Sequence, residues 1–195
     1  MFELVIFDFD DTIVHLDIPW TEVKEDVIRI AEAKKIAVDM TEHLVLLGNR
    51  LAEHSEIKKS IDELYLRYEL ECIDKGAYAP FSNMLHLIKD LRAKRCKLAI
   101  ASGNHTASIK QILSHMDLLD SFDFICGRNL VTRNKPNPDQ LLFILKKLKV
   151  SNTHALFAGD SKFDELAAKN AAIRFFLLEP NDWSSLEKLR NLLFK

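Results

Sequence analysis

Five short apolar segments constrain the fold of this 195-residue chain more than any other feature. Each is rich in residues that favour strands, and each is nearly continuous in apolar character instead of alternating between apolar and polar. Strands buried on both faces have this composition, which is typical of a parallel sheet covered by helices. The five segments are residues 4–7, 98–101, 122–126, 155–158 and 173–178.

Helical patterns separate these segments in the second half of the chain. Ser82 is expected to cap a helix, and Pro138 and Asp139 are expected to begin another. The alternation of strand and helix from about residue 82 onward predicts an α/β fold with a doubly wound parallel sheet. The apolar stripes that support it are Leu85, Ile88 and Leu91; Ile109, Ile112, Leu113 and Met116; Leu141, Leu142, Leu145 and Leu148; and Leu186, Leu189, Leu192 and Leu193.

Between the first strand and Ser82, only helical periodicity is found. A helical insertion of about 60 residues after the first strand is therefore expected. This predicts a core domain formed by residues 1–15 and 81–195, with a helical domain at 16–80. The three stripes are Val23, Val27, Ile30 and Ala31; Leu44, Leu47 and Leu51; and Ile57, Ile61, Leu64 and Tyr68.

Charge and cysteine content limit the classes of partner and compartment. With 27 Lys and Arg against 29 Asp and Glu, the net charge of −2 favours neither nucleic acid nor a membrane surface as a partner. The three cysteines are widely spaced and are expected to be free thiols in a reducing compartment. The N-terminal apolar run lacks a basic start and breaks at Asp8, so a cytoplasmic protein is expected, as a monomer or a weak homo-oligomer.

A cluster of acidic residues follows the first predicted strand. Asp8, Asp10 and Asp11 place three carboxylates within four residues. Two unit charges about 4 Å apart, at an effective dielectric constant near 20, repel by about 4 kcal/mol. Such a cluster needs a cation, a proton or full solvation. A solvated acidic turn remains the alternative at this point.

A second pair of carboxylates, Asp160 and Asp164, follows the fourth predicted strand. Ligands of parallel sheets bind beyond the carboxyl ends of the strands. If the first and fourth strands are neighbours, Asp160 converges with Asp8 and Asp10. Oxygen ligands without His or Cys suit Mg²⁺. Asp160 could also be a helix N-cap.

Two further segments carry groups that suit an anion. Ser102 and Gly103 end the second predicted strand just before a helix, where a hydroxyl and free backbone N–H groups form an anion site. Ser102 could equally be a plain N-cap. Lys135 precedes a proline-stiffened approach to the next helix, and its place at the same edge of the sheet favours a functional role over a solvated surface lysine.

Taken in order, these four segments resemble the four motifs of the haloacid dehalogenase superfamily. They read DFDDT at 8–12, ASGN at 101–104, KPNPD at 135–139 and GDSKFD at 159–164. The last motif and the residues after it are similar to the helix-capped phosphatase branch, which includes phosphoglycolate phosphatases and β-phosphoglucomutases. The resemblance covers the whole chain and implies a Rossmann-like core with the insertion as its cap. Asp11 and Ala172 stand where the family often has glycine.

The resemblance implies a role for each site residue. Asp8 would be the nucleophile that forms an aspartyl-phosphate, and Asp10 would be the acid and base. Mg²⁺ would be held by Asp8, the backbone carbonyl of Asp10 and Asp160, with support from Asp164. Phosphoryl oxygens would be bound by Ser102, Gly103 and Lys135.

The expected function is therefore a Mg²⁺-dependent phosphatase that acts on a small phosphorylated metabolite. The nearest alternative is a sugar phosphomutase, and one from a different class is a non-catalytic phospho-acceptor or binding module. In this branch, the cap and the hinges that connect it to the core determine substrate specificity. The candidates are His15, Asp17, Trp20, residues 76–80, Arg50, Arg67 and Lys75, although surface positions or ordinary packing would also explain most of them.

Overall fold

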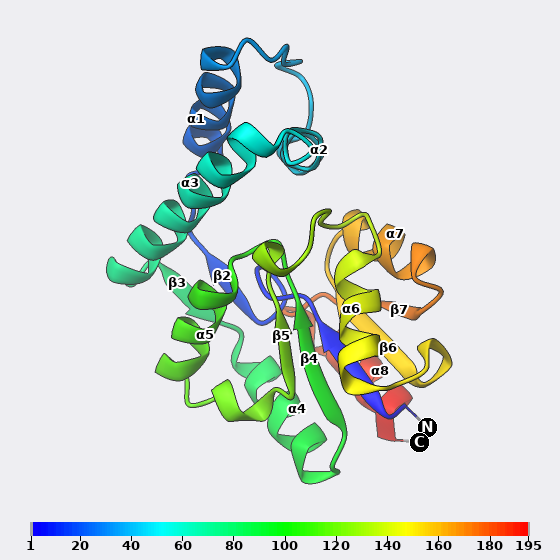
Figure 1. The fold of residues 1–195 in the computed structure, drawn as a ribbon. Helices are drawn as coiled ribbons and strands as arrows, with labels where there is room; N and C mark the ends of the chain where they lie inside the picture. Colours follow the sequence, from blue (N-terminus) through cyan, green and yellow to red (C-terminus); the bar gives the residue numbers. More distant parts are fainter. Residues whose placement is uncertain (1, 195) are drawn as a thin grey trace.

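A five-stranded parallel sheet forms the centre of the computed structural model, which describes residues 2–194. The strand order β5-β4-β1-β6-β7 places the first strand in the middle, next to the second and fourth predicted strands (Figure 1). The doubly wound parallel sheet predicted from the sequence is thus confirmed. The strands are β1 (Leu4–Phe7), β4 (Lys97–Ala101), β5 (Phe124–Cys126), β6 (Ala155–Gly159) and β7 (Arg174–Leu177).

Two hydrophobic layers cover the two faces of this sheet. Val5 and Phe7 of β1 belong to the layer formed with α4 (Ser82–Ala93), α5 (Thr106–His115) and α8 (Trp183–Phe194). Leu4 and Ile6 belong to the layer formed with α6 (Asp139–Leu148) and α7 (Lys162–Asn170). Because both faces are covered, β1, β4 and β6 need apolar residues at almost every position, as their sequences show.

Three local expectations were wrong. Ser82 is the first residue of α4 and not its cap, since Phe81 occupies the N-cap position without a side-chain hydrogen bond. Leu142 is 46% exposed although it lies in a predicted apolar stripe of α6. The last strand is not buried on both faces: β7 is an edge strand, and its Leu177 is 54% exposed.

The helical insertion, defined here as α1 (Trp20–Ala33), α2 (Leu44–Leu51) and α3 (Ser55–Asp74), stands beyond the carboxyl ends of the sheet strands (Figure 1). Each predicted stripe supplies buried residues to the interface between these helices, for example Val27, Leu47 and Ile61.

Two short strands connect the insertion to the core, and the sequence did not reveal them. β2 (Val14–Leu16) and β3 (Tyr78–Pro80) pair antiparallel, with Val14 opposite Pro80. They have only three residues each, too few for a clear periodicity. The predicted domain boundaries fall within or next to this pair of strands.

The remaining elements are three short 3₁₀ helices, η1 (Leu119–Ser121), η2 (Arg128–Leu130) and η3 (Asn152–His154). Cys72, Cys96 and Cys126 are free thiols, as predicted. Across residues 2–194, helices that are both long and apolar enough for a membrane span are absent.

Candidate active site

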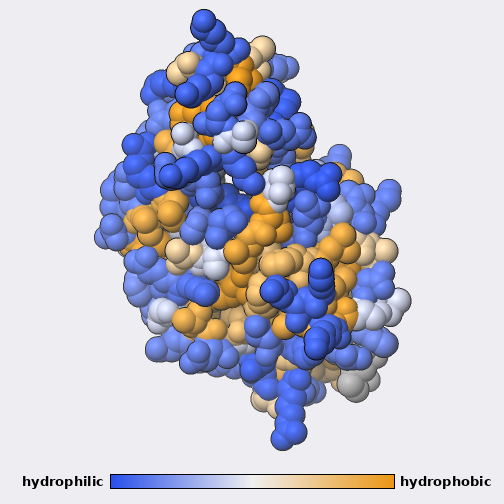
Figure 2. Space-filling model, viewed as in Figure 1, coloured by the Kyte–Doolittle hydropathy of each residue, from blue (hydrophilic) through white to orange (hydrophobic). Residues whose placement is uncertain are grey.

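The predicted site residues meet at the carboxyl edge of the sheet, below the helical insertion. Asp8 follows the central strand β1, and Ser102 and Asp160 follow its neighbours β4 and β6. A cleft of about 1080 Å³ separates this edge from the insertion, and Figure 2 shows a hollow between the two parts of the molecule. Six of the seven predicted residues line the cleft: Asp8, Asp10, Ser102, Gly103, Lys135 and Asp160.

The seventh, Asp164, is fully buried and contacts the cleft through Lys135. The Lys135 Nζ lies 2.7 Å from Asp8 Oδ1 and 2.6 Å from Asp164 Oδ1. Burial acts to lower the pKa of Lys135, but the charges of Asp164 and Asp8 outweigh it and raise the pKa above its ordinary value. Lys135 is therefore a buried cation that two carboxylates hold in its charged form.

Asp164 is fixed by the start of α7. Its Oδ2 accepts a hydrogen bond from the Ser161 backbone N–H at 3.0 Å, while the Ser161 hydroxyl accepts one from the Asp164 N–H, which completes a capping box. Ser161, not Asp160, is therefore the N-cap of α7. Gly159 makes the close approach possible, because a Cβ there would lie 2.7 Å from Asp164 Cγ.

Three carboxylates converge at this point. Single oxygens of Asp8, Asp160 and Asp164 all lie within 4.8 Å of one another. Burial, followed by the nearby charge of Asp164, raises the pKa of both Asp8 and Asp160. The Lys135 ammonium offsets only part of this negative charge. The arrangement of oxygen donors with excess negative charge fits a divalent cation such as Mg²⁺.

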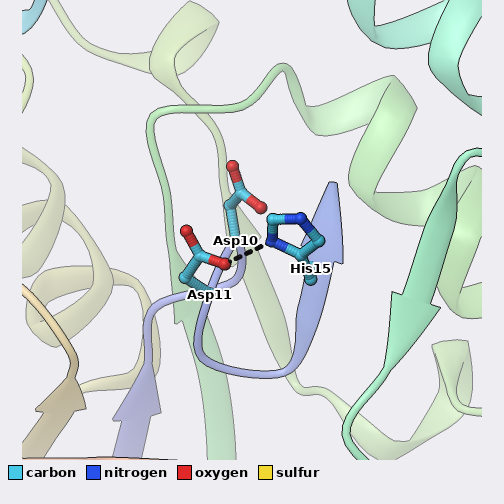
Figure 3. A group of neighbouring side chains, drawn as sticks. All are labelled: Asp10, Asp11 and His15. Carbon is cyan, nitrogen blue, oxygen red and sulfur yellow. Dashed lines mark hydrogen bonds and ion pairs between the residues drawn. The ribbon is translucent and has the colours of Figure 1, made fainter. Parts of the chain in front are cut away.

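Asp10 lies on the turn that leads from β1 to β2 (Figure 3). Its Oδ1 accepts a hydrogen bond from the Leu16 N–H at 2.9 Å, which holds the carboxyl group in place. Burial raises the pKa of Asp10 to about 7, although the Leu16 hydrogen bond acts in the opposite direction. A carboxyl group with this pKa can both give and take a proton near neutral pH.

His15, on β2, forms an exposed pair with the neighbouring carboxylate, because its Nδ1 lies 2.6 Å from Asp11 Oδ1 (Figure 3). This contact, more than any other, raises the pKa of His15.

Ser102 is held at the end of β4 by its own loop. Its Oγ donates to Asn104 Oδ1 at 2.9 Å and accepts from the Asn104 N–H at 3.2 Å. Gln140 of α6 donates to the Ser102 carbonyl oxygen at 2.7 Å. The N-cap alternative for Ser102 is wrong, because His105 caps α5 through its Nδ1. Ser102 lines the cleft, where its hydroxyl would have to turn from Asn104 to donate to a bound anion.

Comparisons with known proteins agree with this geometry. A family model described as haloacid dehalogenase-like hydrolase matches residues 5–178. The chain belongs to this family. It is similar to the phosphoglycolate phosphatase of Escherichia coli K12, with 29% identity over 109 residues, which covers 56% of this chain but only 43% of that enzyme. It is also 26% identical over 184 residues to the phosphoglycolate phosphatase of Pseudomonas fluorescens, which covers 88% of this chain and 67% of the relative.

Solved structures share this fold. A HAD-superfamily hydrolase of subfamily IA from Geobacter sulfurreducens superposes with a TM-score of 0.61 at 18% identity, covering 98% of this chain and all of the other. CbbY from Rhodobacter sphaeroides, solved in complex with phosphate, superposes with a TM-score of 0.62 at 22% identity, covering 91% and 86%.

Two departures of this chain from the family pattern lie at positions with the same unusual backbone conformation. Asp11 and Ala172 replace glycines that are frequent in the family, and their φ angles are +57° and +52°. Both lie in the left-handed region, which glycine adopts freely. Asp tolerates this region better than Ala, because its short polar side chain can form local hydrogen bonds. The strain is therefore greater at Ala172.

One polar cluster at the cleft was missed by the sequence analysis. Arg128, the first residue of η2, is 7% exposed and connects the core to α3 of the helical insertion. Its Nε lies 2.7 Å from Asp62 Oδ1, and its Nη1 donates to Glu69 Oε1 and, at 3.2 Å, to the Gly103 carbonyl oxygen. The one available signal was Glu69, a charged residue within an otherwise apolar stripe of α3.

The candidates for substrate binding in the insertion divide into two groups. Trp20 lines the cleft. Arg50, Arg67 and Lys75 instead pair with carboxylates of the insertion itself, namely Glu42, Asp26 and Glu71. These three basic residues do not line the cleft in the part of the chain that the structure describes.

Proposed function

We propose that this hydrolase is a Mg²⁺-dependent phosphatase that acts on a small phosphorylated metabolite through an aspartyl-phosphate at Asp8. The observation that carries the proposal is the position of Asp8. Its Oδ1 lies 2.7 Å from the Lys135 Nζ, and one of its oxygens lies within 4.8 Å of oxygens of Asp160 and Asp164. It also stands two residues before an acid with a pKa of about 7. The names of the similar phosphatases support the same reaction class.

In the first step, the Asp8 carboxylate attacks phosphorus while the bond from phosphorus to the leaving oxygen breaks. Asp10 gives its proton to that oxygen, so the product leaves as a neutral alcohol. In the second step, Asp10 takes a proton from water, and the water oxygen attacks phosphorus. The Asp8–phosphorus bond breaks, which releases phosphate and restores both carboxyl groups. The Leu16 N–H keeps Asp10 oriented in both steps.

A phosphoryl group carries negative oxygens that must be neutralised beside carboxylates. Lys135, the Ser102 hydroxyl and the Gly103 N–H would bind them from the protein side. Asp8, Asp160 and the backbone carbonyl of Asp10 would hold Mg²⁺. When bound, the ion supplies the positive charge that lets a phosphate approach Asp8. Asp164 would act indirectly, by holding Lys135.

The helical insertion would serve as a cap domain formed by residues 16–80, because it covers the cleft that contains Asp8. A cleft bounded by the core on one side and by the insertion on the other suits a small substrate better than a macromolecule.

The proposal is tested with a generic aryl phosphate and Mg²⁺. We expect phosphate release from the wild-type protein, loss of release with excess EDTA, and loss in Asp8→Asn. Asp90→Asn, which removes a half-exposed carboxylate on α4 that pairs with Arg190, should retain activity. Absence of release from the wild-type protein would refute the proposal. Isomer formation from a sugar phosphate with a bisphosphate activator would identify a phosphomutase. Stable phosphorylation of Asp8 without turnover would identify a phospho-acceptor.

A further inference from the structure

Asn49 of α2 forms an unusual contact between the helical insertion and the core. Its Nδ2 donates to the carbonyl oxygens of Asn134 and Lys135, at 3.2 and 3.1 Å. Its Oδ1 accepts from the Asn134 backbone N–H at 2.8 Å. One side-chain amide thus pairs with the backbone of two consecutive residues, through its nitrogen as donor and its oxygen as acceptor.

The contacted segment is the one that carries the buried lysine of the site. From the core side, Asn137 donates to the Asn134 carbonyl oxygen and Asn170 donates to that of Pro136, both at 3.0 Å. From the cleft side, Asn49 holds the backbone of this segment. The backbone fixed by Asn49 is where the Lys135 side chain begins, and its ammonium ends between Asp8 and Asp164.

We propose that Asn49 is a positioning residue for Lys135. By holding the backbone of residues 134 and 135, it fixes the position of the Lys135 main chain relative to the sheet. This position determines where the Lys135 ammonium lies relative to Asp8. The inference rests on the proposed function, because it assigns Asn49 to the same phosphoryl-transfer site. Since Asn49 belongs to the insertion, the lysine is fully positioned only while the insertion covers the cleft. Closure and assembly of the phosphate-binding groups are then one event.

The hydrogen bonds of Asn49 also argue against a direct role in substrate binding. Asn49 lines the cleft, but its amide nitrogen already donates to two backbone carbonyl oxygens. A substrate would have to displace these bonds to use them. The geometry therefore favours an action through Lys135.

Two variants and a matched control test this role. Asn49→Ala removes all three hydrogen bonds. Asn49→Asp keeps the size of the side chain but turns an oxygen, in place of a donor, toward two carbonyl oxygens. Arg50→Gln is the control: Arg50 is the next residue of α2, but its contacts are with Glu42 and the Ala37 carbonyl oxygen, within the same part of the chain. The full chain is used throughout, with an aryl phosphate and Mg²⁺.

Two readouts are compared. For both Asn49 variants, we expect kcat to fall by about 10- to 100-fold while KM changes little, because misplacement by about 1 Å can have an effect of this size on the transition state alone. In Asn49→Ala, the Asn134 amide hydrogen, followed by NMR, should exchange at least about tenfold faster with solvent, because its acceptor is gone. Arg50→Gln should match the wild-type protein in both readouts.

The proposal is overturned if kcat is unchanged in Asn49→Ala, whatever the exchange rate, or if Arg50→Gln lowers kcat by the same factor. A rise in KM at constant kcat would also overturn it, since that result would indicate substrate contact. Failure of the proposed function would instead show as no phosphate release by the wild-type protein, and the exchange of Asn134 is measured independently of that.

Discussion

Arg128 should be one of the most sensitive positions of the chain for stability. Arg128 is 7% exposed and its partner Glu69 is 2% exposed, so Arg128→Met leaves a buried carboxylate without its cation. The remaining donor to Glu69 is the His105 N–H, at 3.0 Å. Removing one partner of a buried ion pair typically lowers the free energy of unfolding by about 3 to 5 kcal/mol. That is a large part of the stability of an ordinary domain.

A double variant separates two contributions to the lost stability. One is the loss of the ion pair itself, and the other is the cost of a buried carboxylate that has no cation beside it. Arg128→Met combined with Glu69→Leu removes both buried charges and leaves one apolar side chain on α3 and one on η2, facing each other. Asp62, the other partner of Arg128, is about one-third exposed and can be hydrated again. We therefore expect the double variant to be more stable than Arg128→Met alone, with a coupling energy between the two sites of about 1 to 3 kcal/mol.

Urea unfolding of each variant measures these differences. The control is Arg133→Met, in the same segment, because Arg133 pairs with Asp139 at the surface and should be nearly neutral when replaced. The reasoning is refuted if Arg128→Met unfolds at the same urea concentration as Arg133→Met. It is also refuted if the effects of Arg128→Met and Glu69→Leu simply add.

Three further predictions concern Asp10, Gly159 and Ala172. Because burial raises the pKa of Asp10 to about 7 and the acid must be protonated to act, kcat/KM should decrease as the pH rises through about 7; a profile flat from pH 6 to 8 would contradict this. Gly159→Ala would place a Cβ 2.7 Å from Asp164 Cγ, so urea unfolding should show a loss of about 1 to 3 kcal/mol. Ala172→Gly relieves a φ of +52° and should raise the free energy of unfolding by about 1 kcal/mol, seen as a higher Tm; a lower Tm would argue against strain there.

The core fold was predictable because its signals are local. Apolar runs such as 155–158 and the stripe Ile109, Ile112 and Leu113 each report on burial within one element. The edge position of β7 was not visible, because the order of strands in a sheet is set by how the helices cross over it and not by any single strand. The strands β2 and β3 are too short for periodicity to register.

The candidate site was predictable for a different reason. In a parallel sheet, all strands end at the same edge, so residues just after the strands meet whatever their separation in sequence. Asp8 and Asp160 are brought together in this way. No such rule predicts the contacts of Asn49 and Arg128. They depend on how α2 and α3 are oriented above the sheet, and their partners lie 85 and 59 residues away along the chain.

Asp164 shows how the structure adds contacts to a residue that the sequence had already located. The resemblance assigns it to the support of a metal ion, and in the structure its Oδ2 also takes part in the capping box of α7 while its Oδ1 faces the Lys135 ammonium. Gly159 lets this carboxylate lie directly against the end of β6. The turn from β6 to α7 therefore orients the lysine from below, while Asn49 holds the same lysine's backbone from above. Two separate parts of the fold therefore fix the position of Lys135, and a change in either should move the Lys135 ammonium relative to Asp8.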